Sequence, residues 1–444
     1  MTHERHDVIV IGGGPAGSIA ALRLARDGYR VCVLEKDQHP RFHIGESILP
    51  RNMPLIKELG LEVAVRALPH VPKYGAEFGF GDDFNTRRFR FTDGLLPGFP
   101  VFNVERSHFD AMLLNEARKA GAMIFEDRPA RAIRELRDGA VTIDTDRGPV
   151  HGRLLIDASG HGTVVGRHLG QRRTFDEPEL QKVAYFEHFD GVERLEGEDG
   201  GHPGIIMTDE GWFWLIGIGT DKTSVGFVTR PSFVRELGVP ANKILQWAIA
   251  RCPVVRHRMR NAVGSTDNRV LSDFSYTCEP FAGPGYFMVG DAGCFLDPIF
   301  STGVTLAMMG GNHAATLADA MFRGTISPSR AQHQYRTFIK GSTSVFWNLI
   351  RMYYKHSFRE LFMNGTGPVR VHAAIISILA GQVFPRPVWS LRWRLKFFEV
   401  CVQLQEHVPL VPHRRSFSLL RERPVAPSPE RTHERAHPEL AASM

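Results

Sequence analysis

Three glycines near the N-terminus have the spacing of a loop that binds a phosphate group. They are Gly12, Gly14 and Gly17 in the sequence GGGPAG, with Ala16 between the last two. The first permits a tight turn, the second lets backbone approach a pyrophosphate, and the third lets the following helix pack closely on a strand. Backbone N–H groups at the start of that helix suit the pyrophosphate. Glu35, eighteen residues after Gly17, is placed to accept ribose hydroxyls, so this segment predicts a dinucleotide site.

A second glycine-rich segment, YFMVGDAGCFLDPIFSTGV, indicates which dinucleotide is bound. A strand is expected to end at Asp291, and Gly303 is expected to open an apolar helix. This pattern resembles the second flavin fingerprint of FAD-dependent monooxygenases of the glutathione-reductase type, in which the aspartate binds the ribityl chain. A nicotinamide enzyme of simple Rossmann type does not need this segment. The two segments together predict FAD as the cofactor.

The residues around the first glycines predict the elements that hold them. The β-branched run DVIVIG predicts a buried parallel strand, and the apolar residues of SIAALRLARDG have the period of a helix. YRVCVLEK predicts a second strand with Glu35 at its end. We therefore expect an α/β fold, in which a glutathione-reductase-type FAD-binding Rossmann domain is interleaved with a substrate-side β-sheet layer and followed by a C-terminal helical region.

The pattern of the remaining chain predicts three regions. A monooxygenase-type module is expected over 1–340, with the substrate-side sheet contributed by about 71–104 and 180–282, where short aromatic strands alternate with glycines. Residues 341–420 are rich in aromatics and arginine and predict helices. Residues 421–444 are rich in proline and charge, which predicts a disordered tail.

Two further segments are expected to lie beside the cofactor. Ser107 precedes an apolar helix, and Arg106 just ahead of it resembles the arginine that contacts FAD in the same monooxygenases; an ordinary surface ion pair is the alternative. Residues 131–157 predict a β-hairpin and a return strand into the dinucleotide sheet. Asp157 and Gly160 resemble the D-x-x-G that structures a turn near FAD.

Composition limits the other function classes. The net charge of +6 is small and spread along 444 residues, so no nucleic-acid partner is expected. No uncharged apolar run is long enough for a transmembrane segment, and the N-terminus lacks the pattern of a secretory signal, so we expect a cytoplasmic protein. The cysteines lack C-x-x-C spacing, and we expect no metal site and no disulfide framework. They are Cys32, Cys252, Cys278, Cys294 and Cys401.

Four motifs together resemble the flavin-dependent halogenases, over roughly residues 5–410. Lys73-x-Gly75 followed by Phe78 and Gly81, together with the double tryptophan, discriminates this family from other monooxygenases. The remaining two motifs are partly shared with those enzymes. The four are HIGESILP, KYGAEFGFG, GWFWLIGI and DPIFSTGV.

The resemblance assigns a chemistry to these residues. Reduced FAD and O2 give a flavin hydroperoxide that a halide ion attacks, which yields hypohalous acid. Thr302 and Gly303 match the family's chloride position, where N–H groups at a helix start suit an anion, although Ser-Thr-Gly is also a plain helix start. Lys73 is the catalytic lysine, acting either as an ammonium that polarises the halogen or, with a pKa lowered by burial, as a neutral amine that is halogenated. The same resemblance places three more residues at FAD: Arg41, Glu46 and Val304.

Two tryptophans are expected to separate the substrate from the flavin. Trp212 and Trp214 alternate on a strand and should share one face, which in the family suppresses direct oxygen transfer; the alternative is a role as core aromatics. The family's proline is replaced here by Gly217, which predicts a looser wall and leaves hydroxylation open. The tryptophan-specific branch has a glutamate where this chain has Phe300. The chain therefore resembles the phenol- and pyrrole-type branch, in which Phe300 would border the substrate.

These inferences lead to a first hypothesis and two alternatives. The first is an FADH2- and O2-dependent halogenase that chlorinates or brominates an electron-rich phenol or pyrrole, free or held on an acyl or peptidyl carrier protein. A separate NAD(P)H-dependent flavin reductase is its expected partner, because no second nucleotide domain is visible. One alternative is an FAD-dependent aromatic hydroxylase that uses NAD(P)H itself. The other is a membrane-surface isoprenoid reductase, suggested by the aromatic and basic C-terminal helices.

Overall fold

The N-terminal segment folds as expected around a parallel sheet in a computed structural model that describes residues 5–96, 98–272, 275–364 and 367–421. The six strands lie in the order β20-β21-β11-β1-β2-β7, and all but β20 run parallel. Helix α1 (Pro15–Arg26) follows the first strand and begins with the phosphate-loop sequence. The strands are β1 (Val8–Ile11), β2 (Val31–Leu34), β7 (Met123–Phe125), β11 (Leu154–Asp157), β20 (Ala282–Gly283) and β21 (Tyr286–Met288).

A larger sheet lies beside the first and carries the tryptophan strand. Its order is β17-β13-β16-β15-β14-β4-β5, with β18 paired to β13, and its pairs are antiparallel except β14 with β4. The predicted segment 71–104 divides between this sheet and a separate pair, β3 (His70–Lys73) with β6 (Val101–Val104). The strands of the large sheet are β4 (Gly75–Phe80), β5 (Asp83–Arg90), β13 (Val183–Asp190), β14 (Gly204–Met207), β15 (Gly211–Gly217), β16 (Thr223–Thr229), β17 (Val263–Gly264) and β18 (Arg269–Leu271).

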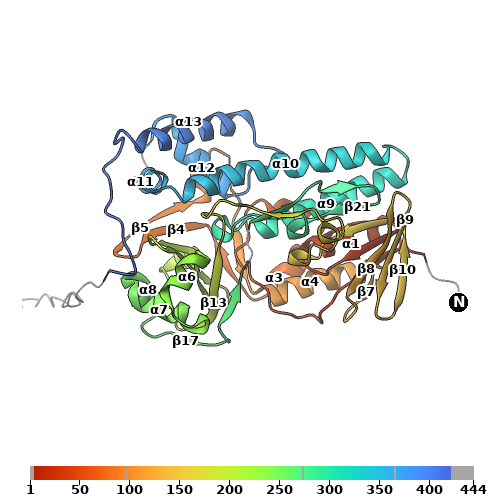
Figure 1. Cartoon of the computed structure of the whole chain (residues 1–444), viewed down its shortest axis with the longest axis horizontal. Helices are drawn as coiled ribbons and strands as arrows, with labels where there is room; N and C mark the ends of the chain where they lie inside the picture. The colour runs from red at the N-terminus through yellow and green to blue at the C-terminus, as the bar shows by residue number, and fades with distance from the viewer. Residues whose placement is uncertain (1–4, 97, 273–274, 365–366, 422–444) are drawn as a thin grey trace, which may run out of the picture.

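Helices cover the two sheets and join them (Figure 1). The apolar helix α9 (Gly303–Phe322) packs against α1, and Gly311 permits this because a Cβ there would lie 2.3 Å from the carbonyl oxygen of Ala16. The long α10 (Pro328–Tyr353) runs above both sheets, so the predicted boundary at 340/341 falls inside a helix. The other C-terminal helices are α11 (His356–Asn364), α12 (Val371–Leu379) and α13 (Trp389–Gln405).

Three smaller parts surround this frame. Residues 130–152 form a three-stranded antiparallel sheet before the return strand β11, so the predicted hairpin has one strand more than expected. A helical segment interrupts the predicted stretch 180–282 and packs on the outer face of the large sheet. The strands are β8 (Ala130–Arg137), β9 (Ala140–Thr145), β10 (Gly148–Gly152), β12 (Arg172–Thr174), β19 (Tyr276–Cys278) and β22 (Cys294–Phe295). The helices are α2 (Asn52–Glu58), α3 (Glu62–Arg66), α4 (Arg106–Lys119), α5 (Val164–His168), α6 (Pro231–Leu237), α7 (Ile244–Arg251) and α8 (Pro253–Arg258).

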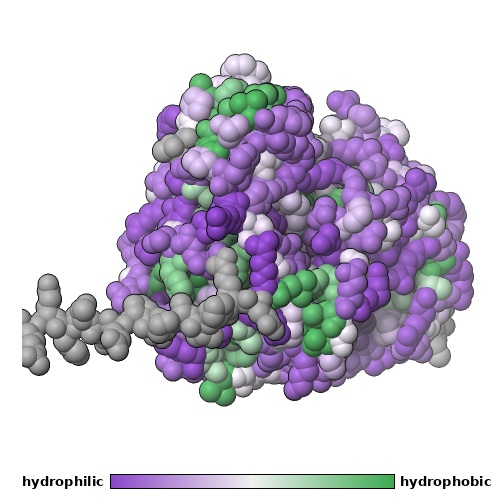
Figure 2. Space-filling view, turned by 60° about the vertical axis from the view of Figure 1, so that its left-hand side comes forward, coloured by the Kyte–Doolittle hydropathy of each residue, from purple (hydrophilic) through white to green (hydrophobic). Residues whose placement is uncertain are grey.

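The main hydrophobic core is continuous from the dinucleotide sheet through the inner face of the large sheet to the C-terminal helices. The interleaved parts therefore share this main core, while a second core lies on the outer face of the large sheet and a third on the other face of the dinucleotide sheet. The face shown in Figure 2 is mostly polar, with apolar residues in patches at its top and nearer its centre. Trp389, the first residue of α13, is 74% exposed. None of the helices in the described ranges is long and apolar enough to cross a membrane. The predicted tail lies, apart from Arg421, outside the described residues.

Candidate active site

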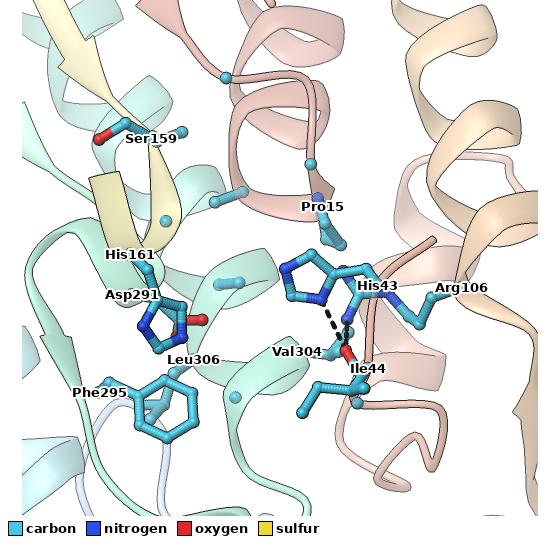
Figure 3. Close-up of a pocket in the computed structure, with 18 of the residues that line it drawn as sticks. Pro15, His43, Ile44, Arg106, Ser159, His161, Asp291, Phe295, Val304 and Leu306 are labelled. Atoms are coloured by element: carbon cyan, nitrogen blue, oxygen red, sulfur yellow. Dashed lines mark hydrogen bonds between the residues drawn. The ribbon is translucent and has the colours of Figure 1, made fainter. Parts of the chain in front are cut away.

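A cavity of about 430 Å³ lies between the dinucleotide sheet and the tryptophan strand. Its walls come from segments that are far apart in the chain, and Figure 3 shows Pro15, His43 and Arg106 facing Asp291 and His161 across it. Nearly all of the predicted cofactor residues line it: Gly12, Gly14, Ala16, Glu35, Arg41, Glu46, Arg106, Asp291, Gly303 and Val304. Gly17 lies just behind them, in the first turn of α1.

The glycines shape this cavity as a dinucleotide requires. Gly12 has φ +100°, and a Cβ there would meet the carbonyl oxygen of Ala158 at 2.3 Å. A Cβ on Gly17 would lie 2.0 Å from the carbonyl oxygen of Gly12, so the helix can approach the strand only without a side chain. At Gly14 the nearest atom is a guanidinium nitrogen of Arg41 at 3.5 Å, which leaves the backbone open to the cavity. The residues present therefore fit FAD.

The variant Gly17→Ala tests this fit. The added methyl must displace either α1 or β1, so we expect FAD affinity to fall about 5- to 150-fold, as a loss of about 1–3 kcal/mol would produce. Isothermal titration of the apoprotein with FAD measures it. Gly28→Ala is the matched control, since a Cβ at Gly28 meets no atom within 4 Å, although its φ of +87° costs some stability. An unchanged affinity in Gly17→Ala would contradict the assignment.

Glu35 is held ready to accept hydroxyl groups. It follows β2 directly, is buried, and accepts the N–H of Gly13 at 2.6 Å and that of Asp37 at 2.9 Å. Burial alone would raise the pKa of this carboxyl, but the His39 ring, with Nε2 3.8 Å from Oε2, the two N–H groups and the charge of Arg41 lower it to about 2. Glu35 is thus a carboxylate at neutral pH, as ribose binding requires.

Arg106 lines the cavity, but three of its N–H groups donate hydrogen bonds to other residues of the protein. Its guanidinium donates to both carboxylate oxygens of Asp110, at 2.7 and 2.9 Å, and to the carbonyl of Ile44 at 2.7 Å. His43 donates its Nδ1–H to the same carbonyl at 2.7 Å (Figure 3), and burial lowers the pKa of His43 to about 3, so the ring is neutral. Arg106 therefore shapes the 41–47 segment around the cavity. The i,i+4 spacing of Arg106 and Asp110 on one helix was the sequence signal for this pair.

Glu46 has a buried partner that the sequence did not reveal. His188 on β13 lies with Nε2 2.7 Å from Oε1 of Glu46, and both side chains are buried. The ring of Phe42 lies beside His188, with centroids 5.4 Å apart. The pair ties the HIGESILP segment to the large sheet. No local pattern marks it, because the two residues are 142 positions apart.

The predicted halide position lies at the N-terminus of α9. Thr302 is the N-cap residue and Gly303 the first helical residue; both line the cavity with Val304. A Cβ on Gly303 would meet no atom closer than Oδ1 of Asp291 at 4.0 Å, so this helix start is open. Burial raises the pKa of Asp291, while the charges of His161 and Arg106 act against that rise. Phe300, by contrast, does not line this cavity; its ring packs edge-on against Tyr353.

Trp212 and Trp214 share one face of β15 as predicted and both line the cavity. Their ring centroids lie 6.0 Å apart, and Phe213 points to the opposite side, into the second core. Trp214 donates its indole N–H to Ser224 at 3.1 Å. At Gly217, where the family has its proline, the space that a Cβ would take is occupied: Cζ of Arg194 lies 2.8 Å from that position.

Lys73 is buried at the end of β3, with 2% of its surface exposed. Its Nζ donates to Oγ of Ser47 at 2.8 Å and to the carbonyl of Ile48 at 3.0 Å, and it lies 5.3 Å from the ring centroid of Phe91. Burial lowers the pKa of Lys73 to about 7. Lys73 does not itself line the cavity described above, but Ser47 does, so one side chain separates the amine from the flavin side.

The lowered pKa has a consequence for stability. An amine that ionises near pH 7 when folded and at 10.5 when unfolded destabilises the fold at every pH below 10.5, fully so below about 7. Lys73→Met is therefore expected to raise the free energy of unfolding by about 2 kcal/mol at pH 6.5, after the loss of two hydrogen bonds is subtracted. The gain should shrink as the pH rises from 7 to 10.5. Urea unfolding at several pH values measures it, and a destabilised variant at pH 6.5 would contradict it.

Comparison with known proteins identifies the family. The model of the FAD binding domain family matches residues 5–333. The chain is 33% identical to the 1H-pyrrole-2-carbonyl-(peptidyl-carrier protein) brominase of Pseudoalteromonas luteoviolacea, over 79% of this chain and 86% of that protein. It is also 33% identical to the sulochrin halogenase of Aspergillus terreus, over 72% of this chain and 64% of that longer protein. The solved structure of the flavin-dependent brominase Bmp2 superposes with a TM-score of 0.79 and 28% identity, over 90% of this chain and all of the other. With an FAD-binding core that matches over most of its length, this chain belongs to the flavin-dependent halogenases, a family of FAD-dependent oxidoreductases.

Proposed function

We propose that this protein uses FADH2 and O2 to chlorinate or brominate an electron-rich aromatic, a phenol or a pyrrole, through Lys73. The observation that carries the proposal is the state of the Lys73 amine. It makes two hydrogen bonds, both as donor, which is the full donor capacity of a neutral amine and leaves its lone pair free. The pKa of about 7 makes that neutral form accessible near physiological pH.

The remaining site residues support the same reaction. FAD, when reduced, supplies with O2 the two-electron oxidation that turns a halide ion into hypohalous acid. Thr302 and the N–H groups at the start of α9 hold the halide beside the cofactor. Trp212 and Trp214 keep the substrate from the flavin side. The Lys73 amine then takes the halogen: an N–X bond forms as the O–X bond breaks, and the N–H proton leaves with hydroxide as water. The arene accepts the halogen from nitrogen, and the displaced ring proton restores the amine.

Position 300 in the DPIFSTG loop and the names of two relatives support the proposed substrate class. Phe300 packs in the core against Tyr353, so position 300 itself supplies no carboxylate to orient a free amino acid. Two relatives are named for pyrrole-2-carbonyl groups on a peptidyl-carrier protein, a brominase and a chlorinase. This supports a phenol or pyrrole that is either free or attached to an acyl or peptidyl carrier protein. We place the enzyme in the cytoplasm with a separate NAD(P)H-dependent flavin reductase.

A reductase-coupled assay tests the proposal. Purified protein is supplied with FADH2 from an added reductase, O2, bromide or chloride, and a panel of phenols and pyrroles. Halide-dependent gain of one halogen per product, seen by mass spectrometry, is the expected result. Hydroxylated product without halogen, or rapid stoichiometric oxidation of NADPH by the protein alone, would instead identify a hydroxylase.

A further inference from the structure

A hydrogen-bonded series joins the tryptophan wall to the loop that precedes the halide position. Trp212 donates its indole N–H to the hydroxyl of Tyr354 at 3.2 Å. The same hydroxyl donates to Oδ2 of Asp297 at 2.7 Å, and Oδ1 of Asp297 accepts the N–H of Ile299 at 2.9 Å. Tyr354 follows α10 directly, so the series connects β15, the end of α10 and the DPIFSTG loop.

The two ends of this series are cavity residues, whereas Tyr354 is not. Trp212 and Asp297 both line the FAD cavity, and they are 1% and 3% exposed. An indole N–H and a carboxylate that are buried to this degree each need a partner, and one phenol hydroxyl serves both. Tyr354 therefore fixes the ring plane of Trp212 and the direction of the Asp297 carboxylate at the same time.

A buried lysine holds the face of the tyrosine ring. Nζ of Lys182 lies 3.9 Å from the ring centroid of Tyr354, and the residue is 4% exposed. Burial lowers the pKa of Lys182 to about 8, while the charges of Asp297 and Glu179 act against that fall. The ring thus lies between a cation on its face and a carboxylate at its hydroxyl, an arrangement that restricts its rotation.

We infer that Tyr354 is a positioning residue that holds Trp212 of the tryptophan strand and Asp297 of the DPIFSTG loop in one fixed arrangement. It acts through Trp212, which bounds the flavin side, and through Asp297, six residues before Gly303 in the turn that leads to the Thr302 N-cap. Resting on the halogenation proposed above, the inference predicts that Tyr354 controls two quantities: the affinity for the halide, and the share of oxidant that reaches the arene rather than escaping. The reacting atoms need not touch Tyr354.

The adjacent tyrosine offers a matched control. Tyr353 is fully buried, and within the described residues its hydroxyl has no hydrogen-bond partner. Tyr353→Phe and Tyr354→Phe remove the same atom from neighbouring positions. Only the second leaves Trp212 and Asp297 without their shared partner.

Steady-state halide titration with the two variants is the first experiment. For Tyr354→Phe we expect the KM for bromide to rise about tenfold, with more H2O2 released per halogenated product, while FAD binds as in the unsubstituted protein. Tyr353→Phe should keep the original KM and the original product yield. Equal effects in both variants would show that Tyr354 contributes only packing, which would overturn the inference. An unchanged KM and yield in Tyr354→Phe would also overturn it.

A binding measurement separates this inference from the proposed function. The absorbance spectrum of protein-bound oxidised FAD is recorded during titration with bromide, with no turnover required. A weaker bromide response in Tyr354→Phe than in Tyr353→Phe supports the positioning role even if the assay finds no halogenated product. Identical bromide responses in the two variants would overturn the inference even if the unsubstituted protein proves to be a halogenase.

Discussion

Lys73→Met is expected to lose halogenation by at least about 10²-fold, the lower end of what a positioned proton-transfer or nucleophilic group contributes. The thioether has similar length but no amine nitrogen, so no N–X bond can form. Once the first hypohalous acid has oxidised the sulfur to a sulfoxide, later hypohalous acid finds no acceptor. FAD binding and oxidation of FADH2 should continue, because Lys73 lies outside the FAD cavity and only its partner Ser47 borders it. The expected products are therefore H2O2 and free hypohalous acid. Lys57→Met, at an exposed position, is the control.

The pH dependence and a second variant decide which form of the amine reacts. If the neutral amine accepts the halogen, kcat/KM rises with pH and levels off above about 7, the pKa to which burial lowers Lys73. Lys73→Arg keeps a positive charge at every accessible pH, so it should be as inactive as Lys73→Met. Substantial activity in Lys73→Arg, or a rate that falls as the pH rises through 7, would show that a cation polarising hypohalous acid is sufficient.

Gly303→Val is expected to lose halide-dependent turnover by about 10²-fold or more, within the range for removing one preorganised electrostatic contact. The added side chain points into open space, since the nearest atom to its Cβ is Oδ1 of Asp291 at 4.0 Å. The helix can therefore form unchanged, while the isopropyl group occupies the space in front of the first N–H groups of α9. Halide binding should weaken at a site that remains folded.

Measurements for this variant separate halide loss from misfolding. The KM for bromide and for chloride is determined beside the thermal midpoint and the affinity for FAD. Gly310→Ala on the same helix is the control: its Cβ would make only ordinary contacts, the nearest at 3.4 Å, and Gly310 does not line the cavity. An unchanged KM for bromide in Gly303→Val would show that the halide does not bind at the start of α9.

The lysine illustrates a conflict between stability and activity. The same burial that lowers its pKa, and so frees the lone pair for chemistry, makes it a destabilising residue in the fold. Lys73→Met is thus expected to be both more stable and less active. A surface lysine would show neither change.

The features that depend on local physics could be predicted from the amino-acid sequence alone. The glycine spacing, Glu35 at the end of β2, the helix start at Gly303 and the shared face of Trp212 and Trp214 depend only on residues close together in the chain. The apolar periods of strands and helices then predicted the α/β arrangement around these residues. Each of these features has the predicted position in the structure.

The contacts that hold these segments together could be found only in the folded chain. Hydrogen bonds join Lys73 to Ser47 across 26 positions, Glu46 to His188 across 142, and Trp212 to Tyr354 across 142. The hydrophobic periodicity of the sequence does not predict such pairs, because each depends on how two separately formed elements pack. The packing of distant elements also explains why Arg194 fills the space at Gly217 and why Phe300 does not line the cavity. Local chemistry is encoded by spacing, whereas the burial that lowers the pKa of Lys73 exists only once distant segments enclose it.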